Sequence, residues 1–397
     1  MDVLELAQRL IAIPSVSPMR PAAPDDPPCE RAMTEFLLDW FAQRGIAAEA
    51  VEATFGRASV VATLPGKPGR GTLILDAHQD TVPPAAESDR PFEGRIVDGR
   101  LCGRGACDVK GPMAAMLVAF ERLSALSPSE RPPIAFVATC DEEFGQAGAI
   151  DVVRRWKRGE FAACVPERVD GVVVAEPTGL QPVVAHNGVL RWTITTHGRA
   201  AHSSRPELGV SAIERMGLVI AAWSGLAERL RTSGLDHPRC GRPRTSIGRI
   251  VGGTAVNIVP DRCEIEIDRR LVPGETFESV RGETAALLAS IPEARATSGE
   301  AWTESLPLVD DRNGSLAAAL ACQVERLGRS SVPIGVPFGT HAPRYAELGG
   351  PVVVFGPGSI DQAHTIDEWI AIDELEAAVD VVERWALEFL PDHDAGQ

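Results

Sequence analysis

The chain has 397 residues, of which 44% are hydrophobic and 24% are charged, and its formal net charge is −16. This length is about twice that of an average domain, so the sequence predicts two domains, each able to bury a core. The negative charge argues against nucleic acids and anionic membranes as partners. The N-terminal residues lack a basic start and an apolar core, and no apolar run approaches the ~18 residues of a membrane span. With eight scattered cysteines and no paired Cys motif, the sequence predicts a cytoplasmic protein with reduced thiols.

In chain order, short runs rich in β-branched residues alternate with segments of helical periodicity. The short runs are apolar on both faces, as is typical of buried strands in a mostly parallel sheet. The first third and the last quarter of the chain therefore predict one three-layer α/β/α domain. Its strands are expected at residues 72–75, 134–139, 172–174 and 352–355, and its helices at 3–11, about 27–43, 112–126, 314–328 and 371–390.

The middle of the chain has a different pattern, in which strands with one polar face alternate with two longer helices. Its order is β-α-β-β-α-β, which indicates a small ferredoxin-like α+β domain with a half-exposed antiparallel sheet. We predict that this domain is inserted between two parts of the larger one, so that the chain divides into residues 1–185, 186–299 and 300–397. The expected elements of the insertion are residues 190–196, 210–231, 245–251, 255–258, 263–269 and 277–290.

Polar residues follow the predicted buried strands at the ends where parallel strands meet. His78 follows the first strand, Glu142 and Glu143 follow the second, and Glu176 follows the third. The last strand leads through a short glycine-rich turn to His364. In open α/β sheets, ligands bind outside the carboxyl ends of the strands. Four strand ends that deliver histidines and glutamates to one edge indicate a metal site.

The glycine-rich loop at 103–111, ahead of a predicted helix, adds Asp108 to this set. Each residue alone has an ordinary alternative: a loop histidine can be satisfied locally, adjacent glutamates can be solvated, and Asp108 can cap the helix. Together, two imidazoles and three carboxylates without a thiolate are typical of catalytic Zn²⁺, for which Co²⁺ or Mn²⁺ can substitute. Five ligands exceed the needs of one open tetrahedral site, so the sequence predicts two divalent ions bridged by one carboxylate.

These motifs resemble, in order and over about residues 70–370, the signature of the M20 metallopeptidase family. Segments 176–183 and 356–364 are most similar to the branch that contains acetylornithine deacetylases and succinyl-diaminopimelate desuccinylases. The resemblance implies that the larger domain is catalytic and that the inserted domain serves in dimerisation and as a lid. It rests on His78-x-Asp80, Gly105-x-x-Asp108-x-Lys110-Gly111, Glu142-Glu143, Glu176-Pro177-Thr178 and His364.

The resemblance also implies a role for each of these residues. Asp108 is expected to bridge the two ions, with His78 and Glu176 completing one site and Glu143 and His364 the other. Glu142 is expected to be the general base that passes a proton from water to the leaving nitrogen. Asp80 is expected to accept the second N–H of the His78 ring. A cis peptide bond is expected after Asp108.

Two segments of the inserted domain resemble family elements that bind the substrate carboxylate. Because a guanidinium matches a carboxylate bidentately, Arg269 (or its neighbour Arg270) and Asn257 are expected to bind substrate. An arginine pair on an exposed strand is the alternative. A further segment, 198–204, resembles the dimer-contact loop, which implies a homodimer in which His202 reaches the partner's site and supports the oxyanion. A solvent-exposed loop histidine is the alternative there.

The function predicted from these residues is removal of an acyl group from the nitrogen of a small carboxylated substrate, an N-acyl-L-amino acid. A dipeptidase or carboxypeptidase of the same family is the nearest alternative, because the chemistry is the same and only the acyl pocket differs. A non-catalytic metal-binding protein is the alternative of another class. It would be expected to lack the base or a ligand, whereas Glu142 and the five ligands are all present.

One position departs from the family pattern. Where this chain has His341, relatives usually carry an acidic or small polar residue. An acid there can pair with a cationic side chain such as that of ornithine, whereas a largely neutral imidazole does so poorly. The sequence therefore predicts deacylation, with His341 at the substrate, and leaves the amino-acid side chain of the substrate open.

Overall fold

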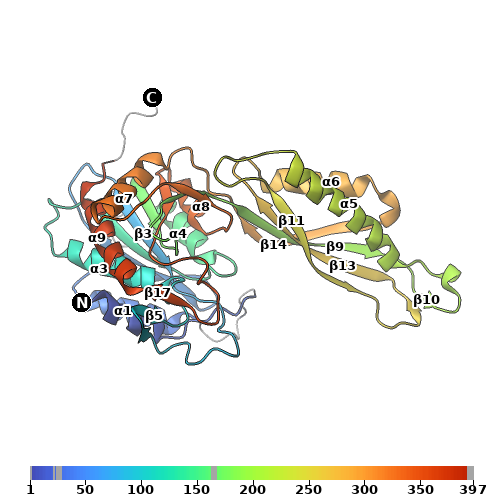
Figure 1. Cartoon of the computed structure of the whole chain (residues 1–397), viewed down its shortest axis with the longest axis horizontal. Coiled ribbons are helices and arrows are strands. Elements are labelled where there is room, and N and C mark those ends of the chain that lie inside the picture. Colours follow the sequence, from blue (N-terminus) through green and yellow to red (C-terminus); the bar gives the residue numbers. More distant parts are fainter. Residues whose placement is uncertain (1, 21–22, 24–28, 162–167, 391–397) are drawn as a thin grey trace. The chain divides into compact units, whose positions relative to one another are not determined.

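The computed structural model describes residues 2–20, 23, 29–161 and 168–390. The chain divides into two compact units (Figure 1). Unit 1 contains Met1–Val184, Asp310–Ile334 and His341–Gln397, and unit 2 contains Ala185–Val309 and Gly335–Thr340. The larger domain is thus built from separate parts of the chain, with the smaller one between them.

Unit 1 contains an eight-stranded sheet within the described residues, in the order β1-β2-β6-β3-β7-β16-β8-β15. A three-stranded sheet, β17-β5-β4, accompanies it. The strands of the large sheet are β1 (Ala48–Thr54), β2 (Arg57–Leu64), β3 (Thr72–His78), β6 (Ile134–Thr139), β7 (Val169–Val174), β8 (Val183–His186), β15 (Ile334–Val336) and β16 (Val352–Val354), and those of the small sheet are β4 (Arg95–Val97), β5 (Arg100–Cys102) and β17 (Trp369–Ala371).

Helices cover both faces of the large sheet. One face packs in a single hydrophobic cluster with α1, α2, α3, α7 and α9, and Figure 1 shows α3 and α9 lying side by side over it. The other face carries α4 and α8. The helices are α1 (Val3–Ile11), α2 (Arg31–Ala42), α3 (Lys110–Ser124), α4 (Ala147–Arg158), α7 (Gly314–Arg326), α8 (Ala342–Tyr345) and α9 (Ile372–Glu388). The predicted three-layer α/β architecture is confirmed.

The centre of the large sheet explains why its strands are apolar on both faces. β6, β3, β7 and β16 are consecutive and parallel, and every residue of these four strands is buried. Side chains of alternating residues reach opposite helical layers, so neither face can be polar. Parallel strands end at the same edge, which brings the segments after all four strands together.

Unit 2 is a four-stranded antiparallel sheet in the order β11-β13-β9-β14, with α5 and α6 packed on one face (Figure 1). This is the β-α-β-β-α-β arrangement expected from the sequence. A separate two-stranded ladder joins β10 and β12. The elements are β9 (Gly188–His197), β10 (Ala201–His202), α5 (Ala212–Thr232), β11 (Arg244–Gly252), β12 (Ile258–Val259), β13 (Arg262–Leu271), α6 (Phe277–Ala289) and β14 (Ala296–Ser305).

Two sequence-based boundaries differ from the structure. The predicted domain limit at 299 falls inside β14, which pairs with β9, and unit 2 continues to Val309. β14 is mostly exposed and polar, so it carries no apolar period that would mark a strand. The predicted strand at 255–258 is reduced to β12, which pairs with β10 outside the four-stranded sheet. No helix among the described residues has the length and apolar character needed to cross a membrane.

Candidate metal centre

The five predicted ligands come from the strand ends and one loop of unit 1. His78 is the last residue of β3, and its Nε2 lies 3.0 Å from Oδ1 of Asp108. The other oxygen of Asp108 lies 3.1 Å from Nε2 of His364, which is itself 3.3 Å from Oε2 of Glu143. Asp108 thus stands between the two imidazoles with one oxygen toward each, the arrangement expected of a carboxylate shared by two sites.

Glu176 joins the same cluster through His78. Ligand atoms of His78, Glu142 and Glu176 lie within 4.8 Å of one another, as do those of His78, Asp108 and Glu143. These two overlapping groups of nitrogen and oxygen donors share His78. The donor set, without sulfur, suits Zn²⁺ in a catalytic site. The group around His78 therefore contains Glu142, the expected base, as well as Glu176, an expected ligand.

The concentration of buried acids is the electrostatic signature of this centre. Burial and the charge of Asp108 raise the pKa of Glu143 to about 7 and raise that of Glu176 well above its usual range. Hydrogen bonds to Asp108 and Glu143 raise the pKa of His364 to about 10. A divalent cation would stabilise these carboxylates in their charged form and the imidazoles in their neutral form, so the residues fit the group.

The loop that carries Asp108 needs its glycines. Gly105 has a φ of +83°, in the left-handed region, and a Cβ there would lie 2.8 Å from Cδ of Lys110. Lys110 is buried, and its Nζ donates to the carbonyl of Ile13 at 2.6 Å. The peptide bond between Asp108 and Val109 is cis, as expected.

Asp80 holds the centre together in a different way from the one expected. Nδ1 of His78 donates to the backbone carbonyl of Asp80 at 2.9 Å and lies 3.6 Å from its carboxylate. The carboxylate instead accepts the backbone N–H groups of Glu142 at 3.0 Å and Glu143 at 3.2 Å. One residue therefore orients the imidazole and also fixes the turn that presents both glutamates.

A buried arginine forms an ion pair with Asp80. Arg57, on β2, is 2% exposed, and its guanidinium contacts Glu30, Asp80 and Asp141. These carboxylates raise the pKa of Arg57 against the opposing effect of burial. The network neutralises part of the negative charge next to the metal centre. No sequence motif indicates this network, since Glu30 and Arg57 lie far from the motifs of the metal centre.

Glu368, which the sequence analysis also missed, holds the Asp108 loop. Its carboxylate accepts the backbone N–H groups of Cys107 at 2.9 Å, of Asp108 at 3.0 Å and of Gly105 at 3.0 Å. It also accepts from the guanidinium of Arg104 at 2.6 Å. Glu368 itself is 3% exposed. A single buried carboxylate thus holds three backbone N–H groups of the loop that carries the proposed bridging ligand.

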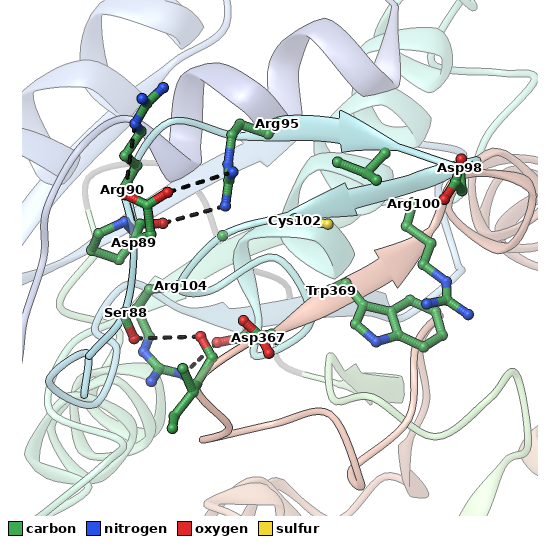
Figure 2. A pocket seen from close by; sticks show the side chains of 15 residues that line it. Ser88, Asp89, Arg90, Arg95, Asp98, Arg100, Cys102, Arg104, Asp367 and Trp369 are labelled. Atoms are coloured by element: carbon green, nitrogen blue, oxygen red, sulfur yellow. Dashed lines mark hydrogen bonds and ion pairs between the residues drawn. The ribbon is translucent and has the colours of Figure 1, made fainter. Parts of the chain in front are cut away.

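Arg104 connects this support to a surface cavity of about 300 Å³ (Figure 2). The cavity lies against β4, β5 and β17, and the guanidinium of Arg100 stacks 3.9 Å above the ring of Trp369 on its wall. Asp89 pairs with Arg90 at 3.7 Å and with Arg95 at 3.9 Å. Among the described residues, none of the five predicted ligands lines this cavity, so it is distinct from the metal centre.

We expect Glu368→Gln to weaken metal binding by roughly 10–100-fold, as is typical for residues that support ligands. Glutamine replaces one acceptor oxygen with an NH₂ group, which would face backbone N–H groups that also donate. The measurement is the dissociation constant for Zn²⁺ by competition with a chelator. Asp367→Asn is the matched control, because Asp367 is adjacent and exposed and lines the cavity. Equal affinities for the two variants would contradict a supporting role for Glu368.

His341, the residue of unit 1 that was predicted to contact substrate, does not lie where that role requires. It is completely buried, and its Nε2 pairs with the carboxylate of Asp76. The prediction that His341 faces substrate is therefore not supported, because the ring is completely buried, with its Nε2 edge against Asp76. A buried aspartate inside an apolar strand was the sequence signal for this partner.

The substrate residues predicted in unit 2 differ in their exposure to solvent. Burial alternates along β13, and Arg269 stands on the helix-covered face, 1% exposed, where it pairs with Glu275 at 2.6 Å. That placement disfavours Arg269 as a ligand of a substrate carboxylate. Arg270 stands on the open face, one third exposed, beside Asp268 at 2.8 Å. Asn257 is exposed in the loop before β12, and its carbonyl accepts from Ser203.

His202 lies in β10 and is exposed. Its Nδ1 lies 2.8 Å from Oγ of Ser204, and the backbone N–H of Ser204 donates to the same nitrogen at 3.1 Å. Both contacts use Nδ1 of the ring.

Comparison with known proteins adds independent information. The profile of the peptidase family M20/M25/M40 matches residues 74–388, which include every predicted ligand. The chain belongs to this family. It is therefore a metal-dependent hydrolase, and the resemblance inferred from the motifs is confirmed.

The relatives are similar along nearly their whole length. The chain is 34% identical to an acetylornithine deacetylase of Proteus mirabilis, covering 94% of this chain and 93% of the relative. It is 31% identical to an acetylornithine deacetylase of Vibrio campbellii, covering 96% and 97%. Among solved structures, a metallo-carboxypeptidase of the M20 family from Sulfolobus solfataricus aligns with a TM-score of 0.78 at 19% identity, covering 98% and 99%. At that identity the structural likeness shows the shared fold.

Proposed function

We propose that the enzyme hydrolyses the amide bond of a small N-acyl-L-amino acid and releases a carboxylate and the free amino acid. The observation that carries the proposal is the full-length similarity to acetylornithine deacetylases, combined with a buried cluster of ligands around Asp108. The cluster is what hydrolysis of an unreactive amide requires, and the relatives supply the class of substrate.

In this proposal the centre holds two divalent ions, with Zn²⁺ as the expected metal and Co²⁺ or Mn²⁺ able to substitute. His78, Asp108 and Glu176 would hold one ion, and Asp108, Glu143 and His364 the other. Bound ions would supply Lewis acidity toward the amide carbonyl and lower the pKa of the attacking water. The support for two sites is the position of Asp108, which has one carboxylate oxygen within 3.1 Å of each imidazole.

Glu142 would take the proton from water and deliver it to the leaving nitrogen. Burial raises the pKa of Glu142, against the opposing effect of the His78 charge, which suits a carboxylate that must hold a proton transiently. Its backbone is fixed by Asp80, so the side chain starts from a defined position beside His78. The non-catalytic alternative is disfavoured because the base and its support are both in place.

The substrate carboxylate would bind to Arg270 and Asn257 of unit 2. Arg270 replaces Arg269 as the preferred candidate because its side chain is one third exposed, although it pairs with Asp268, whereas the side chain of Arg269 is buried against Glu275. An accessible guanidinium can form a bidentate pair with a carboxylate. A substrate whose carboxylate is converted to an amide should then have a higher KM.

We further propose a homodimer formed through unit 2, in which each chain lends His202 to the site of its partner, where it would stabilise the oxyanion. β11 is an edge strand of its sheet, and exposed apolar residues accompany it, among them Ile250, Val251 and Val256. An edge strand with apolar neighbours needs a covering surface. The proposal places the enzyme in a reducing compartment such as the cytoplasm, because its eight cysteines are scattered and form no paired motif.

The test is a substrate panel with and without a chelator. We expect the enzyme to hydrolyse N-acetyl- and N-succinyl-amino acids faster than dipeptides, and to lose this activity in the chelator and regain it with added Zn²⁺. N-acetylornithine belongs in the panel because the relatives are named for it. The carboxamide of the best substrate serves as the matched control for recognition of the carboxylate.

Each other outcome selects a different function. Faster hydrolysis of dipeptides would make the enzyme a dipeptidase or carboxypeptidase with the same metal chemistry. Activity that persists after complete metal removal would contradict the dinuclear proposal. Metal binding with no hydrolysis of any amide in the panel would favour the non-catalytic alternative.

A further inference from the structure

A buried chain of three polar side chains lies next to Glu142. Asp76, in the middle of β3, accepts a hydrogen bond from the hydroxyl of Tyr345 at 2.7 Å and pairs through its second oxygen with Nε2 of His341. Tyr345, Asp76 and His341 are all completely buried. The far edge of the imidazole is directed at Glu142, with Nδ1 of His341 3.7 Å from Oε1 of that residue.

The contacts of His341 determine how its two nitrogens are used. Nε2 must donate to Asp76, because a carboxylate accepts. Nδ1 has no hydrogen-bond partner among the described residues, although it is fully buried. Leaving a buried polar atom unsatisfied costs about 1–3 kcal/mol, and folded proteins keep few of them. With Nε2 donating to Asp76, a protonated imidazole can also donate from Nδ1, and the carboxylate of Glu142, 3.7 Å away, is placed to accept. Hydrogen bonds at catalytic groups often shorten when the substrate complex forms.

We propose that His341 is a positioning residue for the catalytic base: its Nδ1 edge holds the Glu142 carboxylate in place, and Asp76 and Tyr345 lock the ring behind it. The inference rests on the proposed function, in which Glu142 acts as the base. It gives His341 a role in place of the direct substrate contact expected from the sequence. Although burial alone would lower it, the charges of Asp76 and Glu142 raise the pKa of His341, which is consistent with an imidazole set between two carboxylates.

The competing explanation is that His341 has a purely structural role, which would depend on the other nitrogen of its ring. In that case the contact between Nε2 and Asp76 matters, because it ties the start of α8 to β3. For positioning, the Nδ1 edge toward Glu142 matters most. The two nitrogens can be tested separately, because the amide of asparagine reaches approximately the place of Nδ1 and the amide of glutamine approximately that of Nε2.

The experiment compares His341→Gln with His341→Asn, each loaded with Zn²⁺ and checked for metal content. We expect His341→Gln to keep the melting temperature close to wild type but to lower kcat by roughly 10²-fold, the typical effect of a small misplacement. KM should change little. His341→Asn should keep most of kcat even though its melting temperature falls. If kcat instead fell together with the melting temperature, so that the asparagine variant was the less active of the two, the proposal would be overturned.

Crystal structures of the two variants provide a readout that does not depend on activity. The Glu142 carboxylate should move in the glutamine variant and stay in the asparagine variant, and an unmoved carboxylate in both would contradict positioning. If either substitution prevents folding, Tyr345→Phe removes a single oxygen and should still lower kcat several-fold at unchanged KM. Full kcat in that variant would contradict the proposed chain. Failure of the wild type on every amide would instead refute the proposed function.

Discussion

Glu142→Gln is expected to lower kcat by roughly 10²–10⁴-fold, the usual contribution of a general base, while the bound metal stays near the wild-type amount. Glutamine has almost the shape of glutamate but cannot accept and return a proton at neutral pH. The backbone of residue 142 would keep its hydrogen bond to Asp80, so the neighbouring Glu143 should stay in place. The measurements are kcat on the best substrate of the panel and metal content by elemental analysis.

Glu143→Gln is the matched control, since it makes the same chemical change one residue further along the chain. Glu143 contacts His364 and is expected to be a ligand, so this variant should lose metal as well as activity. The comparison matters because the ligand atoms of Glu142, His78 and Glu176 lie within 4.8 Å of one another, as do those of the other ligand group. If Glu142→Gln lost its metal and Glu143→Gln kept it, Glu142 would be the ligand and Glu143 the general base.

The sequence could predict the ligands because the fold places them by a simple rule. The central strands are parallel and buried on both faces, so their apolar runs are unmistakable and the residues after them meet at one edge. His78, Glu142 and Glu176 follow such runs directly. His364 could be placed only because a glycine-rich turn returns the chain to the same edge after β16.

The groups that support the ligands could not be found in this way. Glu368 acts through backbone N–H groups of a loop more than 250 residues earlier in the chain, and nothing near Glu368 in the sequence marks that contact. Arg57 is one of many arginines, and only the folded chain shows that it is buried. Long-range polar contacts depend on tertiary packing, which hydrophobic periodicity does not describe.

The choice between Arg269 and Arg270 could be made from the sequence alone. Cys263, Ile265, Ile267 and Leu271 alternate with polar residues, and this period places Arg269 on the apolar face. A shift by one residue in a strand exchanges the two faces, so neighbouring arginines cannot be treated as equivalent. Similarity to a family segment favours Arg269, whereas the local period of the strand favours Arg270 as the accessible residue.

Mixing two inactive variants is expected to restore activity if the proposed dimer exists. His202→Ala and Glu142→Ala homodimers should each be nearly inactive, since one lacks the oxyanion donor in both sites and the other lacks the base. In a mixed dimer, the site on the His202→Ala chain keeps its own Glu142 and receives His202 from the partner. About one site in two of each mixed dimer should then be complete, because a two-fold dimer has two equivalent sites. The measurement is kcat per chain before and after subunit exchange.

The control for this experiment is a mixture in which complementation cannot occur. In a mixture of Glu142→Ala and Glu143→Ala chains, every site is built on a unit 1 that lacks either the base or a ligand. The partner's unit 2 cannot replace either group, so no mixed site becomes complete. Exchange itself is followed independently with chains that carry different tags. The exposure of His202, and the exposed apolar residues next to edge strand β11, supply the physical reason to expect exchange of function between chains. Demonstrated exchange without any return of activity would show that His202 does not act in the partner's site.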